Sequence, residues 1–187
     1  MLGSGSGGGP LAPSAWPCIF RRVTAYRVAE WSNLFVATAG ASAALAGLVF
    51  VAISINLSRI IAFGSLVDRA GEAVVLLVLP LLVGLAVLVP DVAVRTTGIV
   101  CVIAVVVATV VVDRLLLRAR VAARDRPPYE FRIRMTLAQL ALLPAIVGAV
   151  TLLAGSRRGF DWLAFGAAAQ LVVGIADAWI LLIEILR

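Results

Sequence analysis

Five long apolar stretches dominate this sequence of 187 residues and constrain its fold more than any other feature. A helix needs about 20 mostly apolar residues, each rising 1.5 Å, to cross the hydrocarbon core of a bilayer. These stretches are too long and too continuous for the alternating strands of a membrane barrel. The sequence therefore predicts an all-α polytopic membrane helix bundle with five transmembrane helices, over residues 34–56, 66–89, 97–117, 135–154 and 162–186.

The composition excludes an ordinary soluble protein. Apolar residues make up 63% of the chain and charged residues 14%, against about 45–50% and 25% in soluble domains. The net charge is +6, and every basic residue is an arginine. Because these arginines flank apolar spans, as is usual at membrane ends, we expect no nucleic-acid partner. Two cysteines, Cys18 and Cys101, indicate neither a disulfide framework nor a metal site.

The chain divides into a tail and a bundle. Residues 1–30 combine a flexible stretch rich in glycine, serine and proline with a short interfacial helix near residues 20–31, and residues 31–187 form the five-span bundle. The connections at 90–96 and 155–161 are short, which predicts two antiparallel helix hairpins. We expect Pro90 to end the second span, Thr97 to cap the third and Gly155 to close the fourth.

The arginines also predict an orientation. Five crossings place six arginines on the side of the N-terminal tail and ten on the opposite side. Basic residues are enriched in cytoplasmic loops, so we expect the N-terminus outside and the C-terminus in the cytoplasm of a cell (inner) membrane. The third connecting region, residues 113–134, holds seven of the ten. It marks topology and is also a candidate contact for anionic lipid head groups.

Three polar residues share one face of the last span. Gln170, Asp177 and Glu184 are seven residues apart, which turns a helix only about 20° short of two full turns. A carboxylate near mid-membrane is costly, so this stripe should face the bundle interior. Three interpretations remain open: buried ion pairs, with Arg114 and Arg118 as partners by depth; a path for a proton, a cation or a cationic solute; or contacts between subunits.

Small residues line the first span. Ala39, Ala43 and Gly47 recur every four residues, as do Gly40 and Ala44. This spacing permits close helix approach, which we expect to serve packing within the bundle in preference to a homo-oligomer interface. The segment from Ala37 to Asn56 resembles the opening helix of small multi-span bacterial integral membrane proteins. That resemblance implies a bacterial inner-membrane setting and no activity.

No sequence motif indicates catalysis. The chain has no histidine, which excludes a Ser–His dyad and a zinc-binding HExxH helix. We therefore expect no enzyme, no cofactor and no metal. The favoured function is a structural, accessory or regulatory membrane component, whose partners are membrane lipids and either further copies of the chain or another membrane protein. The alternative is a small channel or transporter subunit that uses the stripe of the fifth span.

Overall fold

The computed structural model describes residues 16–62, 64–122 and 128–186. All regular elements in these ranges are α-helices, and five of them are long and apolar enough to cross a membrane, which confirms the predicted fold class. The sixth, α2, is a short helix after the first span that the sequence analysis did not predict. The helices are α1 (Trp16–Ile55), α2 (Leu57–Ala62), α3 (Gly64–Leu88), α4 (Val94–Ala122), α5 (Pro128–Leu153) and α6 (Gly159–Leu186).

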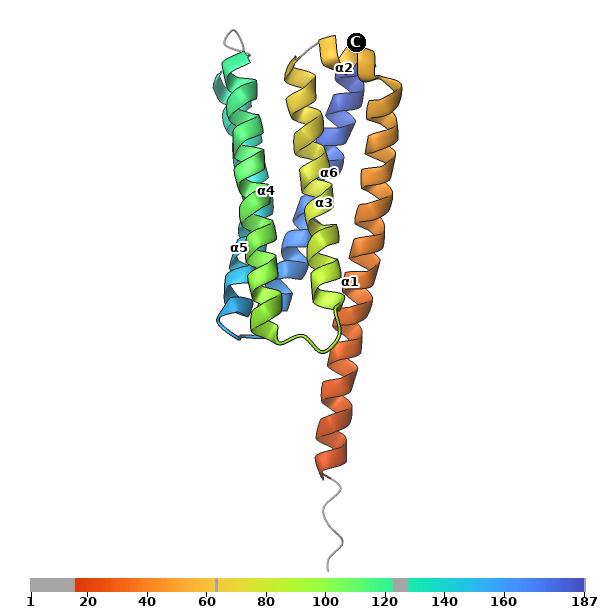
Figure 1. Ribbon diagram of the computed structural model, residues 1–187, viewed down its shortest axis with the longest axis vertical. Coiled ribbons are helices and arrows are strands. Elements are labelled where there is room, and N and C mark those ends of the chain that lie inside the picture. Colours follow the sequence, from red (N-terminus) through yellow and green to blue (C-terminus); the bar gives the residue numbers. More distant parts are fainter. Residues whose placement is uncertain (1–15, 63, 123–127, 187) are drawn as a thin grey trace, which may run out of the picture.

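Four of the long helices form a ring, and α1 lies against its outside. Helix α3 packs against α4 and α6, and α5 packs against the same two helices. The predicted hairpins, α3 with α4 and α5 with α6, are therefore confirmed. Helix α1 contacts mainly α3 and, to a smaller extent, α6 (Figure 1).

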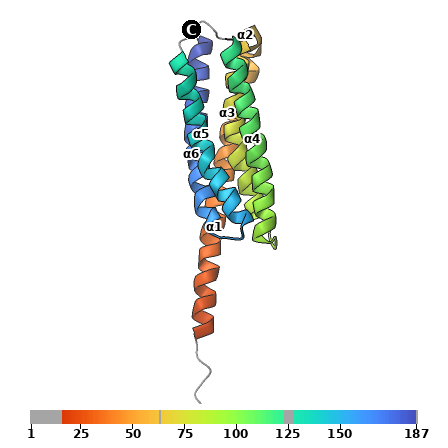
Figure 2. The ribbon, with the colours of Figure 1, turned by 90° about the vertical axis from the view of Figure 1, so that its left-hand side faces the viewer.

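Each long helix runs antiparallel to the long helix that precedes it in the chain (Figure 1). The α3–α4 and α5–α6 connections lie at one end of the bundle, and α2 and the end of α6 lie at the other (Figure 1). Helix α1 has 40 residues, so it is about 60 Å long, roughly twice the thickness of the hydrocarbon layer. Its first turns extend beyond the other helices, as Figure 2 shows. The segment expected as a separate interfacial helix is thus continuous with α1, whereas residues 1–15 lie outside the described part.

Local signals at the helix ends explain two of the three predicted boundaries. Helix α3 ends at Leu88, two residues before Pro90, and Gly155 closes α5 with a left-handed φ of 82° that favours glycine. The prediction for Thr97 was wrong, because α4 begins three residues earlier. The carbonyl of Ala93 accepts hydrogen bonds from the backbone N–H groups of Thr96 and Thr97, so Thr97 lies inside the first turn.

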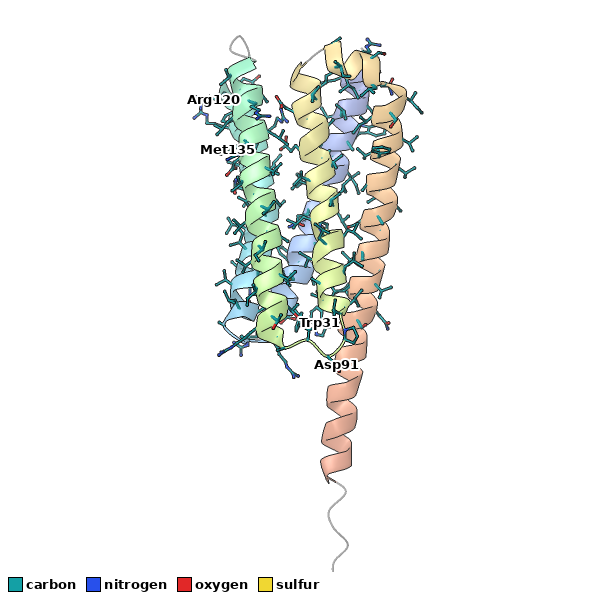
Figure 3. All side chains as sticks on the ribbon, in the orientation of Figure 1. Trp31, Asp91, Arg120 and Met135 are labelled. Carbon is teal, nitrogen blue, oxygen red and sulfur yellow. The ribbon has the colours of Figure 1, made fainter. Side chains whose placement is uncertain are left out.

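The bundle core contains aliphatic and small side chains from all five long helices. Phe35 links α1 to the ring of helices. The centroid of its aromatic ring lies 6.2 Å from that of Trp31 and 6.3 Å from that of Phe160 on α6. Figure 3 shows Trp31 close to the α3–α4 connection that contains Asp91, whereas Arg120 and Met135 lie toward the opposite end. Aromatic packing therefore anchors α1 at the end where the two hairpins turn.

Glycines bring backbones together in the half of the bundle nearest those turns. A Cβ added at Gly98 would lie 2.4 Å from the backbone nitrogen of Leu153, and one at Gly166 would lie 2.7 Å from that of Ala145. Gly84 and Gly148 also face backbone atoms of neighbouring helices. Because these contacts join backbones without intervening side chains, the helices meet closely there. We call this region, defined by Gly84, Gly98, Gly148 and Gly166, the glycine-packed half.

Most of the small residues of α1 do not face a neighbouring helix, unlike the glycines of the glycine-packed half. Ala39 is buried, and its Cβ would lie 3.1 Å from a Cβ added at Gly84. Gly40, Ala43, Ala44 and Gly47 are exposed, and a Cβ added at Gly40 or Gly47 would meet nothing within 4 Å. Of the five predicted packing residues, Ala39 is the one that is buried among the described residues, where it packs against α3.

Candidate functional site

The polar stripe of α6 faces the other helices of the bundle. Gln170 is 1% exposed and Asp177 8% exposed, whereas the side chain of Glu184 is about one third exposed at the end of the span. The side-chain amide of Gln170 donates a hydrogen bond of 3.4 Å to the Ala141 carbonyl of α5. The stripe therefore runs from the middle of the membrane to the end of the bundle at which α2 lies.

Beside this stripe, α3 and α5 are joined by an ion pair whose carboxylate is buried and whose guanidinium group is partly exposed. The Nη2 atom of Arg134 on α5 donates to Oε2 of Glu72 on α3 at 2.5 Å. Glu72 is 1% exposed although it lies six residues, or about 9 Å, inside the span that begins at Leu66. A buried carboxylate requires a charged, hydrogen-bonded partner, and Arg134 supplies it.

A second ion pair joins α3 to α6. Nη1 of Arg69 lies 2.9 Å from Oε2 of Glu184. Arg69 is one helical turn before Glu72, so the two residues lie on the same side of α3. Arg69 meets the adjacent helix α6, whereas Glu72 meets α5 across the ring. Arg69 is buried and Glu184 is half-buried, which places this pair closer to the membrane surface than the first. Together the two pairs connect α5 to α3 and α3 to α6.

Asp177 lies near the two ion pairs. It is within electrostatic range of Glu72, Arg69 and Arg134. Among the residues that the structure describes, Asp177 forms no ion pair within 4.0 Å, whereas Glu72 and Glu184 each do. We call these five residues the charge cluster: Arg69, Glu72, Arg134, Asp177 and Glu184.

Two arginine nitrogens in the charge cluster also lack acceptors. The Nε atoms of Arg69 and Arg134 are buried, and neither has a hydrogen-bond partner in the described part of the chain. Both guanidinium groups use a terminal nitrogen for a glutamate and leave the inner N–H group unused. The cluster therefore combines two paired carboxylates with two unused donors and one carboxyl group outside the ion pairs.

The structure does not bring Arg114 and Arg118 to the stripe. Both side chains are exposed on α4, and α4 packs against α3 and α5. The arginines near Asp177 are instead Arg69 and Arg134. Depth in the membrane, on which the sequence prediction relied, does not reveal which helices are neighbours in the ring.

Sequence reasoning also missed Glu72. The sequence did contain a signal for it, because Glu72 is an acidic residue inside a span of 23 residues. It lies beyond the first turn of that span, where the side chains of charged residues can still reach the membrane surface. Arg69 and Arg134 were counted only as topology signals. The same cost argument that singled out Asp177 would have selected Glu72, because a carboxylate so far inside a span needs a partner.

A smaller polar contact lies next to the charge cluster. The side-chain amide of Gln139 on α5 donates to Oδ1 of Asp113 on α4 at 2.7 Å. Both groups are only partly buried. This contact places a polar link between α4 and α5 in the same half of the bundle, so interactions between side chains now connect all four helices of the ring.

The charges of the cluster interact electrostatically with one another. In the described ranges, no group of three or more histidine, cysteine or acidic residues could hold a metal ion. The charge cluster can join helices, and it can take up or release protons at its carboxyl groups. Comparison with known proteins does not identify the chain, because no protein-family model, curated protein or solved structure matches it.

Proposed function

We propose that this chain is a structural, accessory or regulatory component of a bacterial cytoplasmic membrane, whose bundle does not itself conduct ions or solutes. The observation that carries this proposal is the one-sided position of the charge cluster. Its charged residues lie between the middle of the spans and the end at which α2 lies, and four of the five are joined in two ion pairs. These charges therefore support a role in joining helices, because the two ion pairs connect α3 to α5 and α6.

In the described part of the opposite half, the core beside and beyond Gln170 is apolar. Leu79, Val83, Leu142 and Leu163 are at most 3% exposed and belong to one apolar core. Beyond Gln170, α6 approaches α5 at Gly166, where a Cβ would touch backbone atoms of Ala145. An ion moving through this region would lose its hydration without gaining protein ligands, which costs many kcal/mol.

A channel or transporter subunit is the second candidate. One observation favours it: Asp177 lies inside the hydrocarbon layer and outside the two ion pairs of the charge cluster. A carboxyl group in this position is typical of proton and cation pathways. In this alternative, Asp177 would exchange its ion with water at the end of the bundle where Glu184 is partly exposed.

Flux through reconstituted vesicles separates the two candidates. The full chain would be placed in sealed vesicles, and proton, sodium and potassium flux would be measured under an imposed gradient. We expect the same flux from the natural chain, from Asp177→Asn and from protein-free vesicles. Asp161→Asn is the matched control, because Asp161 is an exposed aspartate on the same helix at the opposite end. Flux above background that is abolished by Asp177→Asn but kept by Asp161→Asn would overturn the proposal.

The proposed orientation places the C-terminus in the cytoplasm and the N-terminus outside. Ten of the 16 arginines support it, although Arg69 and Arg134 of those ten lie in the charge cluster. A single cysteine placed at Ser156, in the α5–α6 connection, would test it after Cys18 and Cys101 are replaced by alanine. An impermeant thiol reagent should label this cysteine on intact cells. Labelling only after lysis would contradict the orientation.

A further inference from the structure

The five charges of the charge cluster do not balance. Three carboxyl groups face two guanidinium groups, so the described cluster would carry a charge of −1 if every group were ionised. An uncompensated charge in a medium of low dielectric constant is strongly unfavourable, and buried groups usually respond by becoming neutral. The cluster can remove this charge by binding one proton.

The geometry distinguishes among the three carboxyl groups. Glu72 accepts a hydrogen bond from Arg134 at 2.5 Å, and Glu184 lies 2.9 Å from Arg69 and is partly exposed to the surroundings. Each of these contacts stabilises an ionised carboxylate. Asp177 is 8% exposed and, among the described residues, accepts no hydrogen bond from either guanidinium group. It therefore has the least stabilisation for a negative charge.

Among the residues that the structure describes, the charged groups around Asp177 come from three helices. Helix α3 contributes Arg69 and Glu72, α5 contributes Arg134, and α6 itself contributes Glu184. The spanning part of α1, Trp31–Ile55, has no charged residue. The buried Nε groups of Arg69 and Arg134 have no acceptor among the described residues. These belong to guanidinium groups that already pair with glutamates.

We propose that Asp177 is a buried proton-binding site, which holds one proton on its carboxyl group at neutral pH and so makes the charge cluster electrically neutral. The step forms one O–H bond on Asp177 and breaks one O–H bond of a hydronium ion, which leaves a water molecule, at the end of the bundle where Glu184 is partly exposed. This proposal concerns the same cluster as the proposed function but does not depend on whether the bundle conducts. A chain without flux can still hold this proton, and so the two proposals can fail separately.

Infrared spectroscopy tests the proposal directly. The full chain in lipid nanodiscs would be measured at neutral pH in H₂O and in D₂O, because the C=O stretch of a protonated carboxyl group is separate from carboxylate bands and shifts to lower frequency in D₂O. We expect this band in the natural chain and in the control Asp161→Asn. It should be lost in Asp177→Asn. A band of unchanged intensity in Asp177→Asn, or no band in the natural chain, would overturn the proposal.

Two further variants keep the assignment falsifiable. Asp177→Glu should retain the band at a changed frequency, because its carboxyl group is still protonated but lies in a slightly different position; an unchanged frequency would contradict the assignment. Glu72→Gln should lose the band, because two carboxyl groups then face two guanidinium groups and Asp177 can ionise without leaving the cluster charged; an unchanged band would contradict this charge balance. Loss of the band in Glu72→Gln together with its persistence in Asp177→Asn would place the proton on Glu72 and reject Asp177 as the site.

Discussion

The two halves of this bundle hold their helices together in different ways. In the glycine-packed half, backbones approach each other at Gly98, Gly148 and Gly166, and the core beside them is apolar. In the half that contains the charge cluster, the glycines Gly71 and Gly174 face side chains of Leu115 and Leu77, and ion pairs join the helices.

This difference has a physical reason. Lipid tails are as apolar as leucine, so the hydrophobic effect alone does not hold transmembrane helices together. Close packing and polar contacts remain as sources of association, and they need opposite geometries. Backbone contact excludes long side chains, whereas arginine and glutamate side chains need space between helices. Each half of this bundle uses one of the two solutions.

The largest effect that would test this comparison is expected from Glu72→Gln. It leaves the guanidinium group of Arg134 without its carboxylate, and breaking a buried ion pair costs about 3–5 kcal/mol. The free energy of unfolding, measured by denaturant titration in mixed micelles, should fall by about this amount. In a double-mutant cycle, Glu72→Gln and Arg134→Gln should be strongly non-additive. Additive losses would show that this pair does not join α3 to α5.

A smaller loss is expected in the other half from Gly98→Ala. The added Cβ would lie 2.4 Å from the backbone of Leu153, so α4 must move away from α5. Overpacking of this kind costs about 1–3 kcal/mol. Gly47→Ala is the matched control, because a Cβ there meets nothing within 4 Å. Equal stabilities for the two variants would contradict the description of the glycine-packed half.

A third effect should come from Glu184→Gln. Its pair with Arg69 is only partly buried, so its contribution lies between those of exposed and buried pairs, at about 1 kcal/mol. Raising the salt concentration should reduce the difference in unfolding free energy between this variant and the natural chain. The difference for Glu72→Gln should depend less on salt, since Glu72 is buried whereas Glu184 is partly exposed. Equal salt dependence for the two variants would contradict this order of burial.

The smallest effect concerns lipid at the charged half. Arg114, Arg118, Arg120 and Arg132 are exposed near that end of α4 and α5, and Arg120 also lies 5.0 Å from the ring centre of Phe131. We expect them to attract anionic head groups, each arginine contributing at most about 1 kcal/mol. Phosphatidylglycerol should therefore raise the melting temperature more than phosphatidylcholine does. Arg118→Gln should reduce this difference, and an unchanged difference would exclude a contribution from Arg118.

Much of the architecture could be predicted from the order of the residues. The length of each apolar stretch determines whether a helix can span the membrane, and the short connections determine which helices form hairpins. Pro90 and Gly155 marked helix ends because proline lacks an N–H group and glycine accepts a positive φ. The prediction that Thr97 caps the third span was wrong because α4 begins earlier, at Val94, so the helix includes residues that the sequence analysis assigned to the connection.

Part of the candidate site was also foreseeable. Gln170, Asp177 and Glu184 share a face because their spacing is nearly two helical turns, and the cost of burying a carboxylate directs that face inward. Their partners were not foreseeable by the same reasoning. Depth alone selected Arg114 and Arg118, whereas the order of the helices in the ring brings Arg69 and Arg134 to Asp177.

The sequence by itself determined five apolar helices, their alternating direction and the polar face of the last one, because these follow from local length and periodicity. Tertiary structure decided which glycines meet a neighbouring backbone, as Gly98 does, and which face outward, as Gly40 does. It also decided that Glu72 and Arg134 form a pair across 62 residues of sequence. The glycine contacts and the ion pair both depend on how the helices are arranged around one another. Periodicity within one helix contains no information about that arrangement.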